Sequence, residues 1–148
     1  MKSLKIWSLA VMLVLAAVGC DKESENIRVT LDDIVGEWHL VEMNNKEVPF
    51  SVYIVFNDDE SFDIYQQVYE LSYVKYSGDY TLEGAILEGS YLDGYDWKNS
   101  YKVSIQSSPK CLILKGDDEV LVYEPCAVPD DVKAEAEGTR AIDAERHL

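Results

Sequence analysis

The chain has 148 residues and a formal net charge of −15, from 28 acidic and 13 basic side chains. A protein this acidic repels phosphate backbones and anionic lipid headgroups, so we expect no nucleic-acid partner. The length is sufficient for one domain with its own core.

The first twenty residues predict the cellular location of the protein. Lys2 and Lys5 make the start basic, thirteen uncharged residues run from Ile6 to Val18, and Gly19 precedes Cys20. This order is typical of a secretory signal, and its apolar part is too short to span a bilayer as a helix. The ending Ala17–Cys20 resembles a bacterial lipobox, in which the cysteine is acylated, although leucine is usual where Ala17 stands. The alternative is plain secretion with Cys20 as an ordinary thiol.

Cleavage before Cys20 removes Lys2 and Lys5 and leaves 129 residues with a charge of −17. We expect residues 1–19 to be the signal peptide and residues 20–29 an acidic tether, because Asp21–Asn26 has no apolar face. Acyl chains on Cys20 then provide the membrane attachment, at about 0.8 kcal/mol for each buried methylene. The tether also resembles the runs that send Bacteroidetes lipoproteins to the outer face of the outer membrane. We therefore expect a lipid-anchored outer-membrane protein, on either the cell-surface face or the periplasmic face of that membrane.

Residues 30–128 predict an all-β domain, because short runs with strand periodicity alternate with turn residues. Tyr76, Gly78, Tyr80 and Leu82 share one face of a predicted strand, and such one-sided strands are typical of antiparallel sheets. Eight strands are expected, at residues 38–44, 52–56, 62–69, 73–82, 86–92, 101–106, 111–115 and 120–123.

The connections between these runs favour an up-and-down barrel. All are short, whereas a Greek-key sandwich needs at least one longer return across an end. Consecutive hairpins give a meander, and an eight-stranded meander removes its exposed edges by closing. We therefore expect an eight-stranded antiparallel barrel in preference to a sandwich.

Short helical segments are expected on both sides of the barrel. Thr30 can cap one helical turn, with Asp32 and Asp33 at its positive end and Leu31, Ile34 and Val35 closing one mouth. Residues 129–148 predict a helix that begins at Pro129 and runs to Gly138, followed by a frayed or disordered tail at residues 139–148.

Cys111 and Cys126 could form a disulfide in an oxidising compartment. A three-residue turn at Gly116–Asp118 would place Cys111 opposite Tyr123, roughly 10 Å along an extended strand from Cys126. A bridge would then require the chain to fold back after Pro125, so the pairing stays open.

The chain resembles the small lipocalin-like lipoproteins of gut Bacteroidetes from about Leu31 to Lys133. The resemblance is carried by Gly36-Glu37-Trp38 after a helical turn, by the hairpin from Val55 to Phe62, by Gly78–Gly84 and by Pro129–Lys133. It implies a barrel that holds a small, partly apolar molecule, although the distal motifs of the larger lipocalins are missing. A narrower barrel filled by its own side chains, acting as a protein- or glycan-interaction module at the cell surface, is the alternative.

Candidate ligand-binding residues are those with aromatic or polar side chains at places where a barrel could meet a ligand. Trp38 could floor the cavity or simply fill its closed end. Gln66 and Ser90 lie in phase with apolar residues and could orient a ligand, although Glu88 on the face of Ser90 favours a wet rim. Aromatic residues expected at strand ends or opposite the core could grip a partner. The full set is Trp38, Gln66, Tyr80, Ser90, Tyr91, Tyr95 and Trp97.

The sequence provides little basis for catalysis or for a cofactor. It contains no nucleophile elbow and no glycine-rich loop before a helix. The acidic clusters lack the spacing of a calcium loop, and His39 and His147 lie too far apart to suggest a zinc motif. We expect a non-enzymatic protein without a metal or cofactor, whose partners are the membrane, a small apolar ligand or an envelope protein.

Overall fold

The computed structural model describes residues 28–138 and 145–148, so the predicted signal peptide and most of the predicted tether lie outside the described residues. Within the described part, the strands are β1 (Gly36–Met43), β2 (Lys46–Glu47), β3 (Ser51–Phe56), β4 (Ser61–Gln67), β5 (Val74–Glu83), β6 (Ile86–Tyr91), β7 (Tyr101–Ser107), β8 (Lys110–Lys115) and β9 (Val120–Pro125). The helices are α1 (Leu31–Ile34) and α2 (Asp130–Gly138). None of these helices is long and apolar enough to cross a bilayer.

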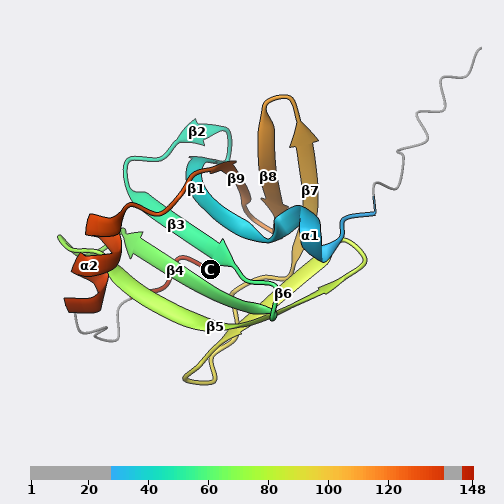
Figure 1. The fold of residues 1–148 in the computed structure, drawn as a ribbon. Helices are drawn as coiled ribbons and strands as arrows, with labels where there is room; N and C mark the ends of the chain where they lie inside the picture. The colour runs from blue at the N-terminus through green and yellow to red at the C-terminus, as the bar shows by residue number, and fades with distance from the viewer. Residues whose placement is uncertain (1–27, 139–144) are drawn as a thin grey trace, which may run out of the picture.

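The strands form one closed antiparallel barrel, as the short connections predicted (Figure 1). Sequential strands from β3 to β9 are neighbours, β1 pairs with β3, and β1 also pairs with β9 to close the ring. Strand β2 was not predicted; it is a two-residue extension that folds back on the end of β1. The sandwich is therefore excluded, and eight strands make the wall.

Alternation along the strands sends one set of side chains into the barrel. On β5, Tyr76, Gly78 and Tyr80 are buried while Asp79 and Thr81 are exposed, which confirms the predicted face. On β6 the predicted phase is wrong. Leu87 and Tyr91 point inward, whereas Ile86 and Glu88 are exposed, so Ser90 faces outward from the barrel.

Two inward-facing glycines make room for aromatic rings. A Cβ atom on Gly89 would lie 2.3 Å from Cε2 of Trp97, and one on Gly78 would lie 2.9 Å from the ring of Phe62. The rings of Phe62 and Trp97 meet edge to face, with centroids 5.0 Å apart. Tyr91 and Trp97 were expected at strand ends or on a face opposite the core, but both belong to the core cluster. Trp97 reaches it because the chain turns back after β6, where the Trp97 N–H donates to the carbonyl of Gly89.

The two helices cover different parts of the barrel. The backbone and side chain of Thr30 both donate to the Asp33 carboxylate, which lowers the pKa of Asp33, and Ile34 is fully buried in the core. Helix α2 begins directly after Pro129 and covers the outer wall, where Val132 and Ala136 pack with Tyr53 and Tyr65. Tyr65 is thus an outward-facing residue that α2 buries.

The β8–β9 turn differs by one position from the prediction. The pairing places Leu112, instead of Cys111, opposite Tyr123, and the backbone N–H of Gly116 donates to the carbonyl of Glu119. Cys111 is buried and Cys126 is exposed, and both are free thiols.

The end of the chain lies inside the barrel, where Figure 1 labels it C. His147 and Leu148 are buried, and Leu148 belongs to the core cluster. The predicted disordered tail is therefore wrong for residues 145–148. Residues 139–144 lie outside the described residues.

Substituting Gly89→Ala tests the fit of the interior. The added methyl group would clash with Trp97, and overpacking of this kind costs roughly 1–3 kcal/mol of unfolding free energy. Urea denaturation would measure it, with Gly138→Ala as the control because a Cβ there meets nothing within 4 Å. Equal unfolding free energies for the two variants would contradict this packing.

Candidate functional site

One end of the barrel presents buried polar groups among apolar neighbours. Gln66 near the end of β4 is 3 % exposed, Tyr91 at the end of β6 is 5 % exposed, and Tyr123 on β9 is fully buried. Burial raises the pKa of both tyrosines, so their hydroxyls are neutral at physiological pH. We call the inward-facing side chains of Gln66, Tyr91 and Tyr123, with the rim beside them, the mouth site.

The mouth site holds the last described residues of the chain. The side-chain amide of Gln66 donates to the carbonyl of Glu145 at 2.9 Å and accepts from the backbone N–H of His147 at 2.8 Å. The Tyr91 hydroxyl donates to the backbone oxygen of Leu148 at 2.9 Å. Each of these inward-facing polar groups therefore has a partner in the tail.

His147 completes the buried network. Its Nε2 atom lies 3.0 Å from the Tyr123 hydroxyl, and its ring meets Phe50 edge on, with centroids 6.3 Å apart. Burial, with a smaller contribution from the nearby Lys98 ammonium, lowers the pKa of His147 to about 4. The imidazole is therefore neutral at physiological pH, and its Nε2 atom can accept a hydrogen bond from the Tyr123 hydroxyl.

Arg146 lies at the rim between tyrosine rings. Its guanidinium carbon is 4.5 Å from the ring centroid of Tyr91 and 5.2 Å from those of Tyr76 and Tyr95. Two guanidinium nitrogens donate to the two carboxylate oxygens of Asp93, and these bonds lower the pKa of that carboxyl group. A planar cation can stack on aromatic faces and make a forked bond at the same time, so this pocket is well suited to a guanidinium.

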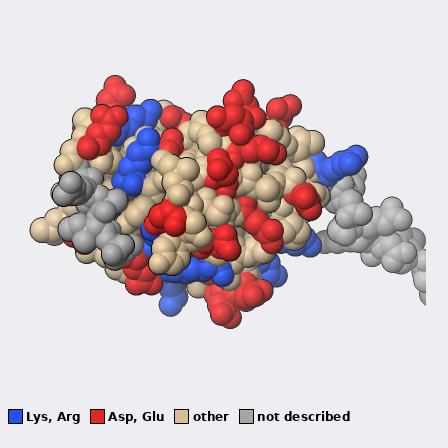
Figure 2. Space-filling view, turned by 90° about the horizontal axis from the view of Figure 1, so that it is seen from below, with Lys and Arg blue, Asp and Glu red and all other residues tan. Residues whose placement is uncertain are grey.

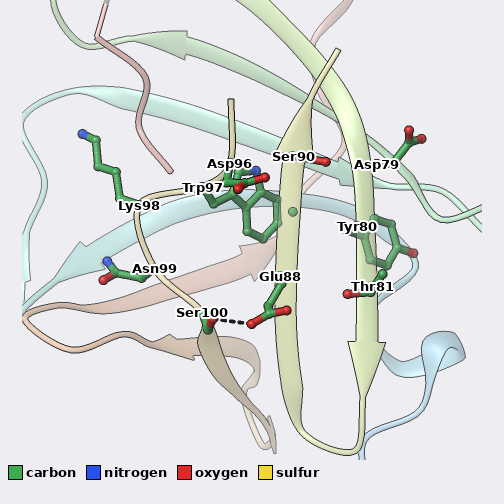
Figure 3. A pocket seen from close by; sticks show the side chains of 11 residues that line it. Asp79, Tyr80, Thr81, Glu88, Ser90, Asp96, Trp97, Lys98, Asn99 and Ser100 are labelled. Carbon is green, nitrogen blue, oxygen red and sulfur yellow. Dashed lines mark hydrogen bonds between the residues drawn. The ribbon is translucent and has the colours of Figure 1, made fainter. Parts of the chain in front are cut away.

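A separate groove runs along the outside of the barrel (Figure 3). It has a volume of about 470 Å³ between the outer faces of β5 and β6 and residues 96–100, and includes Asp79, Thr81, Glu88 and Ser90. Ser100 donates to Glu88 across it, as the dashed line in Figure 3 marks. The groove is open and polar, and among the described residues no group of three or more His, Cys, Asp or Glu side chains could hold a metal ion.

The predicted site residues do not form one site. Gln66, Tyr91 and Tyr95 meet around the tail, while Ser90 lies in the outer groove. Trp97 lies between these two places: its ring is inside the barrel, and its indole N–H is buried without a hydrogen-bond partner among the described residues.

Trp38 and Tyr80 do not join the mouth site. The Trp38 indole donates to the carbonyl of Ile34 at 2.8 Å, and the Tyr80 hydroxyl donates to the carbonyl of Asn57 at 2.7 Å. Tyr80 also packs edge on against Phe56, with centroids 5.0 Å apart. Both rings therefore have structural partners near α1 and the β3–β4 turn.

Sequence reasoning missed Tyr123, Asp93's forked bond with Arg146, and the tail itself. Gln66 is 79 positions from Glu145, a separation at which no local pattern can reveal a contact. The one available signal is the final Leu148 after a polar stretch, and an isolated apolar residue predicts no docking by itself.

Acid should release the tail from the mouth site. Because the pKa of buried His147 is about 4 and that of a free histidine is 6.5, a released tail binds protons more readily. Docking is therefore strongest above pH 6.5 and weakens as the pH falls towards 4, by a factor on the order of a hundred. Hydrogen-exchange protection factors of residues 145–148 would measure this change.

The matched control for acid release is the other histidine. Partial burial also lowers the pKa of His39, which lies away from the tail beside Ser51. His147→Gln should abolish most of the pH dependence of tail protection, and His39→Gln should leave it in place. The same acid-induced loss in His147→Gln would rule out His147 as the group responsible.

Comparisons with known proteins agree with this fold. A family model described as a lipocalin-like domain matches residues 34–108, which is half of the chain. A crystal structure of a lipocalin-like protein from Bacteroides uniformis aligns with a TM-score of 0.52 and 18 % sequence identity, over 64 % of this chain and 99 % of that one. No curated protein matches the sequence. With a matching family model and a closed eight-stranded barrel, the chain belongs to the lipocalin-like domain family.

Proposed function

We propose that this protein is a non-enzymatic, lipid-anchored binding protein of the bacterial envelope, whose mouth site binds a small, partly apolar ligand. The observation that carries the proposal is the set of buried polar groups on Gln66, Tyr91 and Tyr123 within an otherwise apolar wall. A few polar groups among apolar side chains are what orients a ligand in a pocket. The hydrogen bonds from these groups to the tail support the proposal, because they are the kind of contact that would orient a ligand.

The anchoring half of the proposal is supported by the sequence. Cys20 follows a basic and then apolar segment, and acidic residues follow it directly. Acidic side chains are also spread over the face shown in Figure 2. A surface of this charge does not attract anionic headgroups, so acyl chains on Cys20 would have to provide the membrane attachment.

A second function, an interaction module, is favoured by the filled interior. Aromatic rings and the tail occupy the space between the walls, as in a barrel that serves only as a rigid scaffold. Its contact surface would be the β6–β7 loop, where Leu92 is 78 % exposed and Tyr95 is 69 % exposed. Tyr91 and Trp97 were candidates for this surface, but both are buried and cannot contact a partner there.

Retention of a compound from a cell extract would test ligand binding. We expect native mass spectrometry to show a bound compound that Tyr91→Phe holds about two- to tenfold more weakly, since one hydrogen bond is lost. Tyr69→Phe is the control because Tyr69 is exposed. If the mouth retains nothing while Leu92→Ala or Tyr95→Ala loses a protein partner, the interaction module replaces this function.

Metabolic labelling would test the anchor. Cys20→Ser should abolish incorporation of a labelled fatty acid and release the protein from membranes, whereas Cys126→Ser, at an exposed free thiol, should change neither. Membrane association that survives Cys20→Ser would contradict acylation at this residue.

A further inference from the structure

We infer that the mouth site recognises an extended peptide that carries a guanidinium group two positions before an apolar side chain, and that residues 145–148 are its intramolecular occupant. The inference rests on the proposed function and names its ligand class. It also means that an incoming ligand must displace the tail.

The Gln66 amide recognises peptide backbone. Its donor binds the carbonyl of Glu145 and its acceptor binds the N–H of His147, so one side chain contacts both kinds of backbone polar group, two positions apart. A hydrocarbon or a sterol offers no such alternating pair. Gln66 is 3 % exposed, so water has little access to its amide group. An apolar compound in this site would leave the amide without hydrogen bonds, which disfavours its binding.

The rim recognises the cation. Arg146 faces three tyrosine rings and forms a forked bond with Asp93, and its side chain is 16 % exposed. Arg146 itself, with Lys75 and Tyr76, lines an open pocket of about 310 Å³ beside this contact. An ammonium in the place of the Arg146 guanidinium could not form the forked bond, so the geometry selects for arginine over lysine.

The interior recognises the apolar end. Leu148 is 1 % exposed within the core cluster, and Tyr91 holds its backbone oxygen. The three recognised groups therefore lie in chain order, from the backbone of Glu145 through the Arg146 guanidinium to Leu148. Specificity would come from the spacing of these groups.

The tail is held as a ligand is held, without strand pairing. Residues 145–148 form no helix or strand, and the hydrogen bonds that hold their backbone come from the side chains of Gln66 and Tyr91. The ion pair between Glu145 and Lys98 is exposed on both sides. Because residues 145–148 belong to the same chain as the mouth site, they compete with a free ligand as an intramolecular occupant.

A displacement experiment on the full-length protein tests the inference. The probe is a fluorescent tetrapeptide of sequence Glu-Arg-His-Leu, and its binding is followed by fluorescence anisotropy. Arg146→Ala weakens the tethered occupant and leaves the walls of the mouth site intact, so we expect it to bind the probe at least about tenfold more tightly than the wild type does. Arg28→Ala is the matched control, because Arg28 is an exposed arginine that lies before α1.

Two further probes check the chemistry. A tetrapeptide with lysine in place of arginine should bind Arg146→Ala about tenfold more weakly, and the reversed sequence should not compete. Equal binding of the original and reversed peptides would overturn the inference. So would equal affinity of the wild type and Arg146→Ala for the original probe.

Hydrogen exchange provides a second measurement that does not depend on a variant. In the wild type, saturating probe should lower the protection of residues 145–148 without changing that of the barrel strands. Unchanged tail protection in the presence of bound probe would overturn the inference. If an extracted small compound binds Arg146→Ala while no tetrapeptide does, the proposed function stands and the peptide class fails.

Discussion

Closure of the strand ring through β1 and β9 is the constraint on which the rest of this structure depends. A closed eight-stranded barrel has a narrow interior of nearly constant width, so its contents must match that volume. Here aromatic residues are the largest of the fully buried side chains, and Gly78 and Gly89 supply the gaps into which Phe62 and Trp97 fit. The interior is therefore a packed core at the α1 end and along the wall of β5 and β6.

The same closure explains the mouth site. Gln66, Tyr91 and Tyr123 face inward because of strand alternation, so their polar groups cannot turn to bulk water and need partners inside. The tail supplies all of these partners. Any ligand that displaced the tail would have to offer equivalent donors and acceptors, or leave these buried groups unpaired. The binding of the tail at this site is thus a consequence of strand phase and burial together.

Much of the fold could be predicted, because strand periodicity and turn residues are local signals. The eight barrel strands, the α1 cap and the start of α2 follow from patterns within a few residues of each position. The errors arise where the pattern is ambiguous. On β6, Ile86 and Glu88 share the face of Ser90 while Leu87 lies on the opposite face, so both faces carry an apolar residue and the inward face is ambiguous. Tyr91 and Trp97 are aromatic residues, which suit a buried or a half-exposed face equally well.

The sequence by itself determined the order of the eight barrel strands, most of the turns between them and the acidic surface, because each depends on neighbouring residues or on composition alone. Only the tertiary structure decided which tyrosines line the mouth and that residues 145–148 return to it. The bonds from Gln66 to the tail span 79 and 81 positions, and the Tyr123–His147 contact spans 24. Such contacts come from the closure of the barrel, which brings side chains together that no local pattern relates.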